Sequence, residues 1–255
     1  MKIDARGICC SYGEKQVLYD INVSTRPGVT GLLGPNASGK STFLKCLAGI
    51  MDFRGSITYG DVDIGEYTFD RLVTEVGYMP QDAPCRAVLT VFEAILLGRL
   101  HSLTLRENED DIKKVCAVMD GLGIAHLSSK CLNELSGGQK QMVSVAQVLV
   151  REPNYILMDE PTNNLDLRHQ FEMFDVIRDI SKRQGINILV ALHDLNLAAR
   201  YCDKIVMLDA GRVSSQGSPV DVLTPESIRD IYGVNVRVYE DDGRICVVPI
   251  DSVSR

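Results

Sequence analysis

The chain has 255 residues, of which 45% are hydrophobic and 24% charged, and its formal net charge is -7. This length accommodates one large core or a core with an added subdomain, and the composition is ordinary for a soluble globular protein. The negative charge excludes binding to nucleic acid through a general basic field, and no apolar run reaches the roughly eighteen residues that span a bilayer. Because the N-terminus, Met1–Arg6, also lacks the apolar stretch of a signal peptide, we expect a cytoplasmic protein that is not itself a channel.

The eight cysteines show no C-x-x-C spacing, and most of them stand in apolar segments. In a cytosolic chain this pattern favours buried, reduced thiols over disulfide bonds or a metal site.

A phosphate-binding loop is predicted near the N-terminus. Residues 2–9 and 17–25 read as two strands, with Tyr12 in the turn between them, and the apolar run Val29–Leu33 reads as a buried strand. The next segment, Gly34–Ser41, fits G-x-x-x-x-G-K-[ST], and the apolar spacing of Ser41–Gly49 predicts a helix that ends at its glycine. A glycine turn could match this motif by accident, but the flanking strand and helix are the context that the motif requires.

This loop carries the chemistry of nucleotide binding. Its glycines let the backbone approach a phosphate, and the helix start behind it favours an anion. Lys40 would reach the β- and γ-phosphates of a nucleotide, and the hydroxyl of Ser41 would hold Mg²⁺. The residues expected to bind ATP here are Gly34, Pro35, Asn36, Ala37, Ser38, Gly39, Lys40, Ser41 and Thr42.

Helical spacing then replaces strand character. Two further strands are expected at Arg54–Tyr59 and Val76–Gln81, the second stopped by its proline. From about residue 85 to residue 151 the pattern predicts an inserted helical subdomain. Thr90 and Glu93 form a capping box for its first helix, a second helix runs from near residue 107 to residue 121 or 123, and Ser136 caps the third.

The second half of the chain alternates apolar strands with helices, which implies a mostly parallel sheet covered by helices. Its expected elements are strands at 154–159, 186–192, 204–208 and 212–215, and helices at 167–184 and 195–201. Residues 218–233 predict two short capped helices, and residues 234–249 predict a terminal hairpin around Asp241-Asp242-Gly243.

An acidic pair follows one of these buried strands. Asp159 would stand at the carboxyl edge of the sheet, where ligands of open α/β folds bind, and could hold Mg²⁺ through its water shell. Glu160 could orient, or accept a proton from, a water that attacks the γ-phosphate. A helix-capping pair is the alternative, which the upstream phosphate loop disfavours.

The segment Leu135–Gln139, hereafter the signature segment, reads Leu-Ser-Gly-Gly-Gln. It combines a serine hydroxyl, two glycine N–H groups and a helix N-terminus, which makes a second anion site. Together with the phosphate loop and the acidic pair, it resembles the ATP-binding cassette (ABC) ATPases, and the resemblance covers essentially the whole chain.

The resemblance implies a role for several further residues. Two subunits of this family pack head to tail, so Ser136, Gly137, Gly138 and Gln139 would act on the γ-phosphate bound by the partner subunit. Gln81 matches the glutamine that senses Mg²⁺ and the attacking water. His193 matches the histidine that contacts the γ-phosphate, Tyr12 matches the aromatic that stacks on adenine, and Asn164–Asp166 matches the dimer-contact loop. His101, His126 and His169 match nothing in the family pattern.

Two departures from the family pattern are visible. Met142 stands where many members have the second basic residue after the signature, and Asn163-Asn164 stand where small residues are common. Neither change touches a phosphate ligand, but both could alter the rate of hydrolysis or the affinity of the dimer.

The fold class implied is α/β: a P-loop NTPase of ABC ATPase type, with a mostly parallel core sheet, an antiparallel β subdomain and an inserted helical subdomain. The domains expected are residues 1–84 and 152–217 for the ATP-binding core with its N-terminal β subdomain, residues 85–151 for the helical signature subdomain, and residues 218–255 for a C-terminal extension of helices and a β-hairpin.

Two stretches of the second half, residues 192–203 and residues 217–234, look like the importers of iron-siderophores, haem and cobalamin. The resemblance then implies a homodimer on the cytoplasmic face of the cell membrane, with ATP and Mg²⁺ as cofactors and no nucleic acid. Permease subunits would dock around Asp82–Leu97, and an external substrate-binding protein would act indirectly. Importers of molybdate or another metal species, a soluble ABC ATPase of the iron–sulfur cluster assembly type, a nucleic-acid ABC ATPase and an exporter remain as alternatives.

Overall fold

The computed structural model describes residues 1–81, 89–99, 109–163, 165–241 and 244–253. Its centre is a six-stranded sheet in the order β10-β9-β3-β8-β7-β6. The strands are β3 (Gly28–Leu33), β6 (Val76–Met79), β7 (Tyr155–Asp159), β8 (Asn187–Ala191), β9 (Lys204–Asp209) and β10 (Arg212–Gly217). All neighbouring pairs are parallel except β9 and β10, which form an antiparallel edge, so the predicted mostly parallel sheet is confirmed.

This sheet separates two hydrophobic cores. Alternate residues of a strand point to opposite faces, so Leu157 and Leu189 pack toward α1 (Lys40–Leu47), whereas Ile156 and Ile188 pack toward α6 (Leu167–Gln184) and α7 (Leu195–Tyr201). Both faces of these strands are buried, which explains why they read as continuous apolar runs in the sequence.

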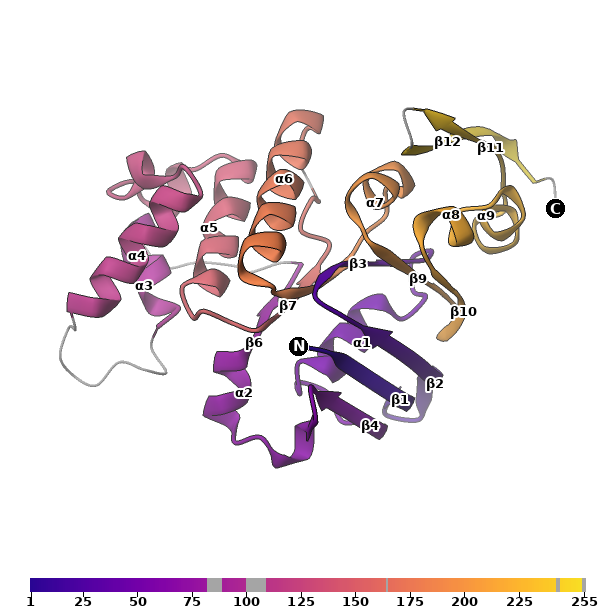
Figure 1. The fold of residues 1–255 in the computed structure, drawn as a ribbon, viewed down its shortest axis with the longest axis horizontal. Coiled ribbons are helices and arrows are strands. Elements are labelled where there is room, and N and C mark those ends of the chain that lie inside the picture. The colour runs from indigo at the N-terminus through magenta and orange to yellow at the C-terminus, as the bar shows by residue number, and fades with distance from the viewer. Residues whose placement is uncertain (82–88, 100–108, 164, 242–243, 254–255) are drawn as a thin grey trace.

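A second, antiparallel sheet covers the α1 side in the order β2-β1-β4-β5 (Figure 1). Its strands are β1 (Ile3–Tyr12), β2 (Lys15–Thr25), β4 (Arg54–Tyr59) and β5 (Val62–Asp63). The hairpin predicted at the N-terminus is longer than expected, because β1 extends to Tyr12, which pairs with Lys15 at the end of the ladder.

Residues 61–75 contain elements that the sequence analysis missed. After β5, the 3-10 turn η1 (Ile64–Glu66) leads to α2 (Phe69–Glu75), which Thr68 caps through the N–H of Arg71. None of the seven residues of α2 is buried, and the sequence offers only a short apolar pattern, Phe69, Leu72 and Val73, behind the capping threonine.

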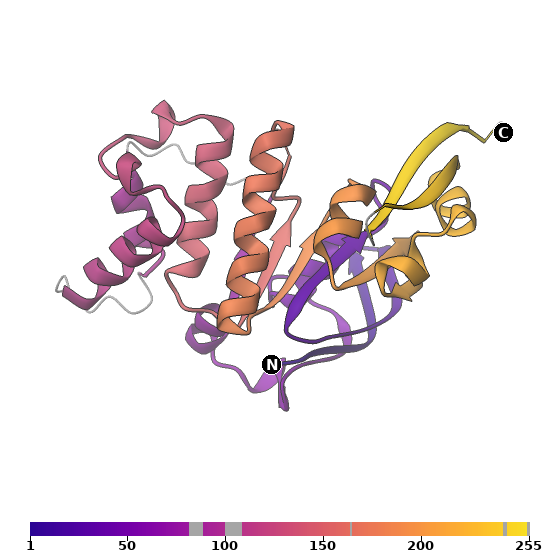
Figure 2. The same cartoon turned by 45° about the horizontal axis from the view of Figure 1, so that its top comes forward.

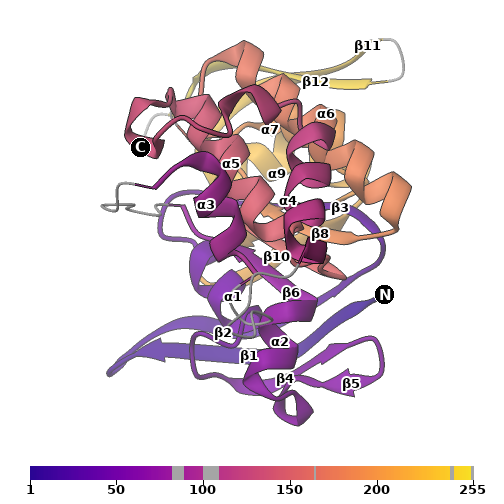
Figure 3. The ribbon, with the colours of Figure 1, turned by 90° about the vertical axis from the view of Figure 1, so that its left-hand side faces the viewer.

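Three helices form a block at one end of the molecule, α3 (Val91–Leu97), α4 (Glu109–Gly121) and α5 (Gly137–Leu149) (Figures 1 and 3). The predicted capping box is present at Thr90 with Glu93, and Ser136, the predicted cap of the third helix, forms a second capping box with Gln139. The 3-10 turns η2 (Ala125–Leu127) and η3 (Leu132–Glu134) connect α4 to α5. The predicted start of the second helix near residue 107 lies outside the described residues.

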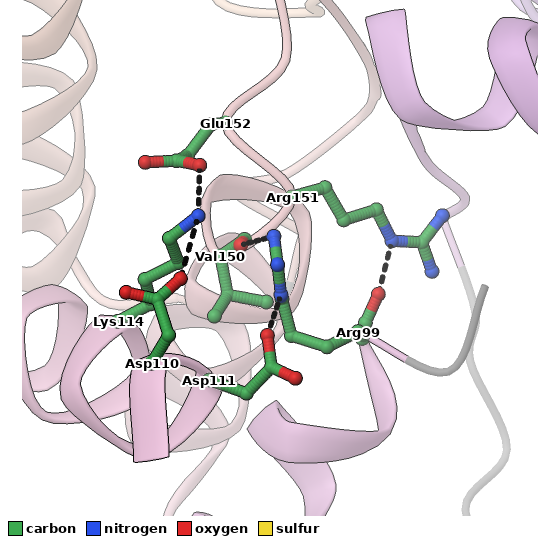
Figure 4. A network of polar contacts seen from close by, with 8 residues as sticks. Arg99, Asp110, Asp111, Lys114, Val150, Arg151 and Glu152 are labelled. Carbon is green, nitrogen blue, oxygen red and sulfur yellow. Dashed lines mark hydrogen bonds and ion pairs between the residues drawn. The ribbon is translucent and has the colours of Figure 1, made fainter. Parts of the chain in front are cut away.

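Polar contacts connect this helical block to the segment that enters β7 (Figure 4). The Arg99 guanidinium donates to Oδ1 of Asp111 at 2.7 Å and to the carbonyl of Val150 at 3.2 Å. Arg151 donates to the carbonyl of Gly98 at 2.8 Å, and Lys114 pairs with Glu152 at 2.8 Å. The end of α3, the start of α4 and the end of α5 are therefore held together where the helical block meets the central sheet.

The C-terminal part lies at the other end of the molecule, beside α7 (Figures 1 and 2). It consists of α8 (Pro219–Val222), α9 (Pro225–Tyr232) and the hairpin of β11 (Val234–Asp241) and β12 (Arg244–Ser252). The two predicted short helices are present, and both have proline at their first position. The hairpin turn at residues 242–243 lies outside the described residues. Among the described helices, none combines the length and the apolar character needed to cross a bilayer.

Candidate functional site

The phosphate loop connects β3 to the N-terminus of α1. Gly34 and Gly39 adopt φ values of 147° and 105°, which L side chains rarely adopt. A Cβ atom on Gly34 would lie 2.1 Å from the carbonyl oxygen of Leu208, so no larger residue fits there. The loop therefore needs its glycines to turn tightly around a space that a helix N-terminus faces, which is the geometry of an anion site.

The side chain of Lys40 folds back onto the start of the phosphate loop. Its ammonium donates to the carbonyls of Gly34 at 2.8 Å and Pro35 at 3.2 Å, and the residue is only 5% exposed. Burial lowers the pKa of Lys40, while the nearby carboxylates of Glu160 and Asp159 act in the opposite direction. A buried cation is best stabilised by an opposite charge close to it, which a phosphate in the loop would supply.

Asp159 and Ser41 meet at the start of α1. The Ser41 hydroxyl donates to Oδ1 of Asp159 at 2.9 Å. Burial raises the pKa of Asp159, and its bond to Ser41 opposes that rise. A hydroxyl and a buried carboxylate beside a phosphate loop are the oxygen ligands that Mg²⁺ takes in nucleotide sites, so these two residues fit the ion.

The next residue, Glu160, stands in the left-handed region with a φ of 50°. Such strain in a non-glycine residue is typical of functional sites. Its two carboxylate oxygens have different partners: Oε1 contacts Nε2 of His193, and Oε2 accepts a 2.6 Å hydrogen bond from the amide of Asn163. Glu160 and His193 are predicted from the sequence as site residues. Asn163 stands out in the sequence only as a departure from the family pattern in the predicted dimer-contact loop.

A cleft of about 900 Å³ brings most of the predicted residues together. Its lining consists of Lys15, Gln16, Val17, Tyr19, Asn36, Ala37, Ser38, Gly39, Lys40, Ser41, Thr42, Gln81, Glu160, Asn163, His193 and Ala210. The loop, the glutamine, the glutamate and the histidine thus come from separate segments to one surface, because the carboxyl ends of the parallel strands share one edge of the sheet.

Tyr12, predicted to stack on adenine, is exposed and lies outside this lining, whereas Tyr19 is part of it. The Tyr19 ring lies under the guanidinium of Arg212, 4.9 Å from its centroid. Tyr19 is not predicted as a site residue, because it stands in the alternating pattern of β2, where a tyrosine usually packs against neighbouring side chains.

The signature segment lies elsewhere, at the N-terminus of α5. Ser136 Oγ accepts from the N–H of Gln139 at 3.3 Å, and the Gln139 side chain accepts from the N–H of Ser136 at 3.1 Å. No residue of the segment lines the cleft.

A histidine without a predicted role packs against the signature segment. A Cβ on Gly138 would lie 2.9 Å from Cδ2 of His169. That histidine contacts Oδ1 of Asp166 through Nδ1 at 2.6 Å. His169 thereby links Asp166 to the signature segment within one chain. Asn164, of the predicted dimer-contact loop, lies outside the described residues, as does His101.

Comparison with known proteins agrees with this geometry. The sequence model of the ABC transporter family matches residues 18–163. An uncharacterised ABC transporter ATP-binding protein of Methanocaldococcus jannaschii is 40% identical over 98% of both chains. A hemin import ATP-binding protein of Pseudomonas fluorescens is 38% identical, covering 91% of this chain and 92% of its own.

A cobalamin import ATP-binding protein of Halobacterium salinarum is 33% identical over 98% of this chain, which spans 64% of that relative's length. Among solved structures, a metal-chelate type ABC transporter in an inward-facing conformation aligns with a TM-score of 0.84, over 98% of this chain and 96% of its own, at 22% identity, and so shows the fold. The chain therefore belongs to the ABC transporter family, as an ATP-binding subunit and an ATPase.

Proposed function

We propose that this protein powers the import of a metal chelate, of the iron-siderophore, haem or cobalamin type, through separate membrane subunits. The support comes from relatives named for hemin and cobalamin import that match more than nine-tenths of the chain. The observation that carries hydrolysis is the single cleft that contains Lys40, Glu160 and His193.

The proposed reaction is an in-line attack of water on the γ-phosphate of ATP. Glu160 orients the water and accepts its proton, since each of its carboxylate oxygens keeps a free lone pair beside its present partner, His193 or Asn163. Lys40 leaves its loop carbonyls for the β- and γ-phosphates and stabilises the negative charge of the transition state. Ser41 and Asp159 would hold Mg²⁺, which Gln81 would sense, and the bound ion would supply further charge neutralisation.

The position of the signature segment supports a homodimer. Ser136–Gln139 lie outside the cleft of their own chain, so they can complete an ATP site only in another copy. In a head-to-tail dimer, Ser136 and the N–H of Gly138 would meet the γ-phosphate bound by the partner subunit. The domain division predicted from the sequence, with residues 85–151 as the signature subdomain, assigns this task to the helical block.

Permease subunits would dock beside this block, around residues 82–97. In the described part of that region, a hollow of about 180 Å³ lies between the end of β6 and the ends of α3 and α5. Its lining includes Tyr78 and Pro80, which precede Gln81, and Leu97, the last residue of α3. A cytoplasmic helix of a permease docked there would be moved by the ATP-driven closure of the dimer. The same contact would hold the protein at the cytoplasmic face of the membrane.

The experiment that tests this function is the ATPase activity of the purified protein, alone and with its membrane pair in lipid. Stimulation by the pair, increased further by a substrate-loaded binding protein, is the expected result. Activity that no membrane subunit changes, and that a soluble scaffold protein raises, would instead support the cluster-assembly alternative. Stimulation by molybdate or another metal species in place of a chelate would reject the proposed substrate class alone.

A further inference from the structure

The C-terminal extension, residues 218–253 as described here, contacts two parts of the ATP site. We propose that it positions His193 and the phosphate loop for hydrolysis, through Asn196 on α7 and Tyr232 on α9. This inference rests on the proposed function of the cleft, but it concerns a part of the chain to which neither the motifs nor the mechanism assigns a role.

The first connection is between the start of α7 and β12. The Asn196 side chain donates to the carbonyl of Val247 at 3.1 Å and accepts from the N–H of the same residue at 2.7 Å. One amide side chain thus satisfies both polar groups of one strand residue, in the manner of a neighbouring strand. Because each bond fixes a different atom of Asn196, the pair defines the orientation of the side chain as well as its distance.

This pairing constrains the histidine by short covalent steps. Only Leu192–Asp194 separate β8 from α7, and Asp194 caps the helix by accepting from the N–H groups of Asn196 at 2.7 Å and Leu197 at 2.9 Å. His193 therefore lies between a strand of the central sheet and a helix turn that is attached to the hairpin. The Asn196–Val247 pair therefore restrains the backbone of His193 from the side of α7, and so limits where the imidazole can reach Glu160.

The second connection is between α9 and the phosphate loop. The Tyr232 hydroxyl is buried and has no hydrogen-bond partner among the described residues. Burial raises the pKa of Tyr232 to about 12, and the backbone of Gly34 opposes this rise. This unsatisfied hydroxyl therefore lies near the first glycine of the loop.

The two connections share one cavity. A hollow of about 290 Å³ has His193, Asn196, Tyr232 and Val247 in its lining. Its apolar walls include the buried residues Ile228, Val236 and Val247. Apolar packing of this kind, together with the bond from the N–H of Val253 to the carbonyl of Gly233, makes the extension a firm support for the two polar contacts.

The extension therefore acts as a brace that keeps His193 and Gly34 at a fixed position relative to each other. Asn196 and Tyr232 are positioning residues, because neither lines the nucleotide cleft. The net contribution of one such hydrogen bond is about 1 kcal/mol, which corresponds to an approximately fivefold change in an equilibrium constant. We expect effects of that order on hydrolysis, much smaller than the loss of a catalytic residue.

The test compares Asn196→Ala with Asn235→Ala. Asn235 also donates a side-chain hydrogen bond, at 2.6 Å to Asp251, but that bond lies within the hairpin and does not reach α7. In the nucleotide-free protein, Asn196→Ala is expected to speed hydrogen exchange of the amides of residues 193–197 about fivefold. The kcat for ATP is expected to fall three- to tenfold with little change in KM, and Asn235→Ala is expected to change neither quantity.

Tyr232→Phe provides a second measurement that keeps the packing of the ring, with Tyr239→Phe as its control, since Tyr239 is exposed on β11. The KM for ATP is expected to rise two- to fivefold in the first variant only. Exchange rates and kcat of Asn196→Ala that equal those of Asn235→Ala would overturn the brace, as would faster exchange without a change in kcat.

The exchange measurement does not depend on ATP hydrolysis, so it tests the brace separately from the proposed function. A wild-type protein that hydrolyses no ATP would reject the proposed function, whatever the exchange data show. A wild-type protein with normal activity and unchanged exchange in Asn196→Ala would reject the brace alone.

Discussion

The Ser41 hydroxyl donates a 2.9 Å hydrogen bond to Oδ1 of Asp159, although 118 positions separate the two residues in the chain. Burial raises the pKa of Asp159 above its ordinary value of 3.8. Ionisation of this carboxyl therefore costs the folded state free energy at neutral pH, and the cost disappears below pH 3.8, where both states are protonated. A cation between the two residues would remove that cost, which is why we assign them to Mg²⁺.

Asp159→Asn is accordingly expected to increase the free energy of unfolding at pH 7 without nucleotide, and to have little effect near pH 3.8. The variant should also lose most of the stabilisation by Mg–ATP, which is about 2.7 kcal/mol for a ligand at 100 times its Kd. Urea unfolding at both pH values, with and without Mg–ATP, measures these effects. Asp179→Asn, at an exposed ion pair on α6, is the control, and a less stable ligand-free Asp159→Asn would contradict the assignment.

Glu160→Gln is expected to bind ATP and dimerise while its turnover falls by about 10²- to 10⁴-fold, the usual contribution of a general base. Single-turnover hydrolysis and size-exclusion chromatography with ATP measure both properties. Normal turnover in this variant would remove Glu160 from its proposed role.

Asn163→Ala should reduce turnover by about tenfold, less than Glu160→Gln, because it removes only the 2.6 Å hydrogen bond that holds Oε2 of Glu160. A double-mutant cycle distinguishes this role from general loosening of the loop, because the effect of Asn163→Ala on turnover should largely disappear in the Glu160→Gln background. Strictly additive losses of turnover would show that Asn163 does not act on Glu160.

Gly138→Ala is expected to weaken the ATP-bound dimer, because its Cβ would lie 2.9 Å from the ring of His169 and would displace the signature segment. His169→Ala removes this obstacle, so the double variant should regain part of the lost dimer affinity. Sedimentation of the variants in a Glu160→Gln background, where ATP persists, gives the coupling energy of the cycle. Strictly additive effects on dimer affinity would indicate that the contact between Gly138 and the His169 ring does not influence dimerisation.

Arg99→Leu is expected to lower the free energy of unfolding by about 3 kcal/mol, because it leaves the carboxylate of Asp111 without its main partner in a site where that side chain is only 5% exposed. Arg168→Leu removes an ion pair whose arginine is 83% exposed, and should have a much smaller effect on the free energy of unfolding. Urea unfolding of both variants measures the difference. Equal losses would mean that the network in Figure 4 does not hold the helical block.

Gly211→Ala is expected to weaken ATP binding by about tenfold or more. Gly211 donates to the carbonyl of Ser38 at 3.0 Å and accepts from the N–H of Tyr19 at 2.8 Å, so its turn connects the phosphate loop to β2. A Cβ there would lie 1.9 Å from the carbonyl oxygen of Val17. Gly185→Ala is the matched control, because its φ of 66° is similarly left-handed but no atom lies within 4 Å of the added Cβ. Similar ATP affinities of the two variants, by isothermal titration, would contradict this role.

The sequence by itself determined the phosphate loop, the two buried strands that end near Gly34 and Asp159, the capping boxes at Thr90 and Ser136, and the family. These features depend on local backbone chemistry: glycines that permit a tight turn, apolar runs that need burial on both faces, and side chains that satisfy helix N–H groups. The helix α2 is not predicted, because its seven residues carry only one short apolar pattern, Phe69, Leu72 and Val73, and none of them is buried.

Only the tertiary structure decided which distant residues meet. Asn163 reaches Glu160 because a strained turn folds back on itself, Gly211 reaches Ser38 because β9 and β3 are neighbours, and Asn196 reaches Val247 because the hairpin returns to α7. Contacts of this kind depend on the order and register of strands, which local propensity does not encode. The same segment that reads as an unassigned C-terminal extension in the sequence therefore becomes, in the folded chain, a neighbour of both Gly34 and His193.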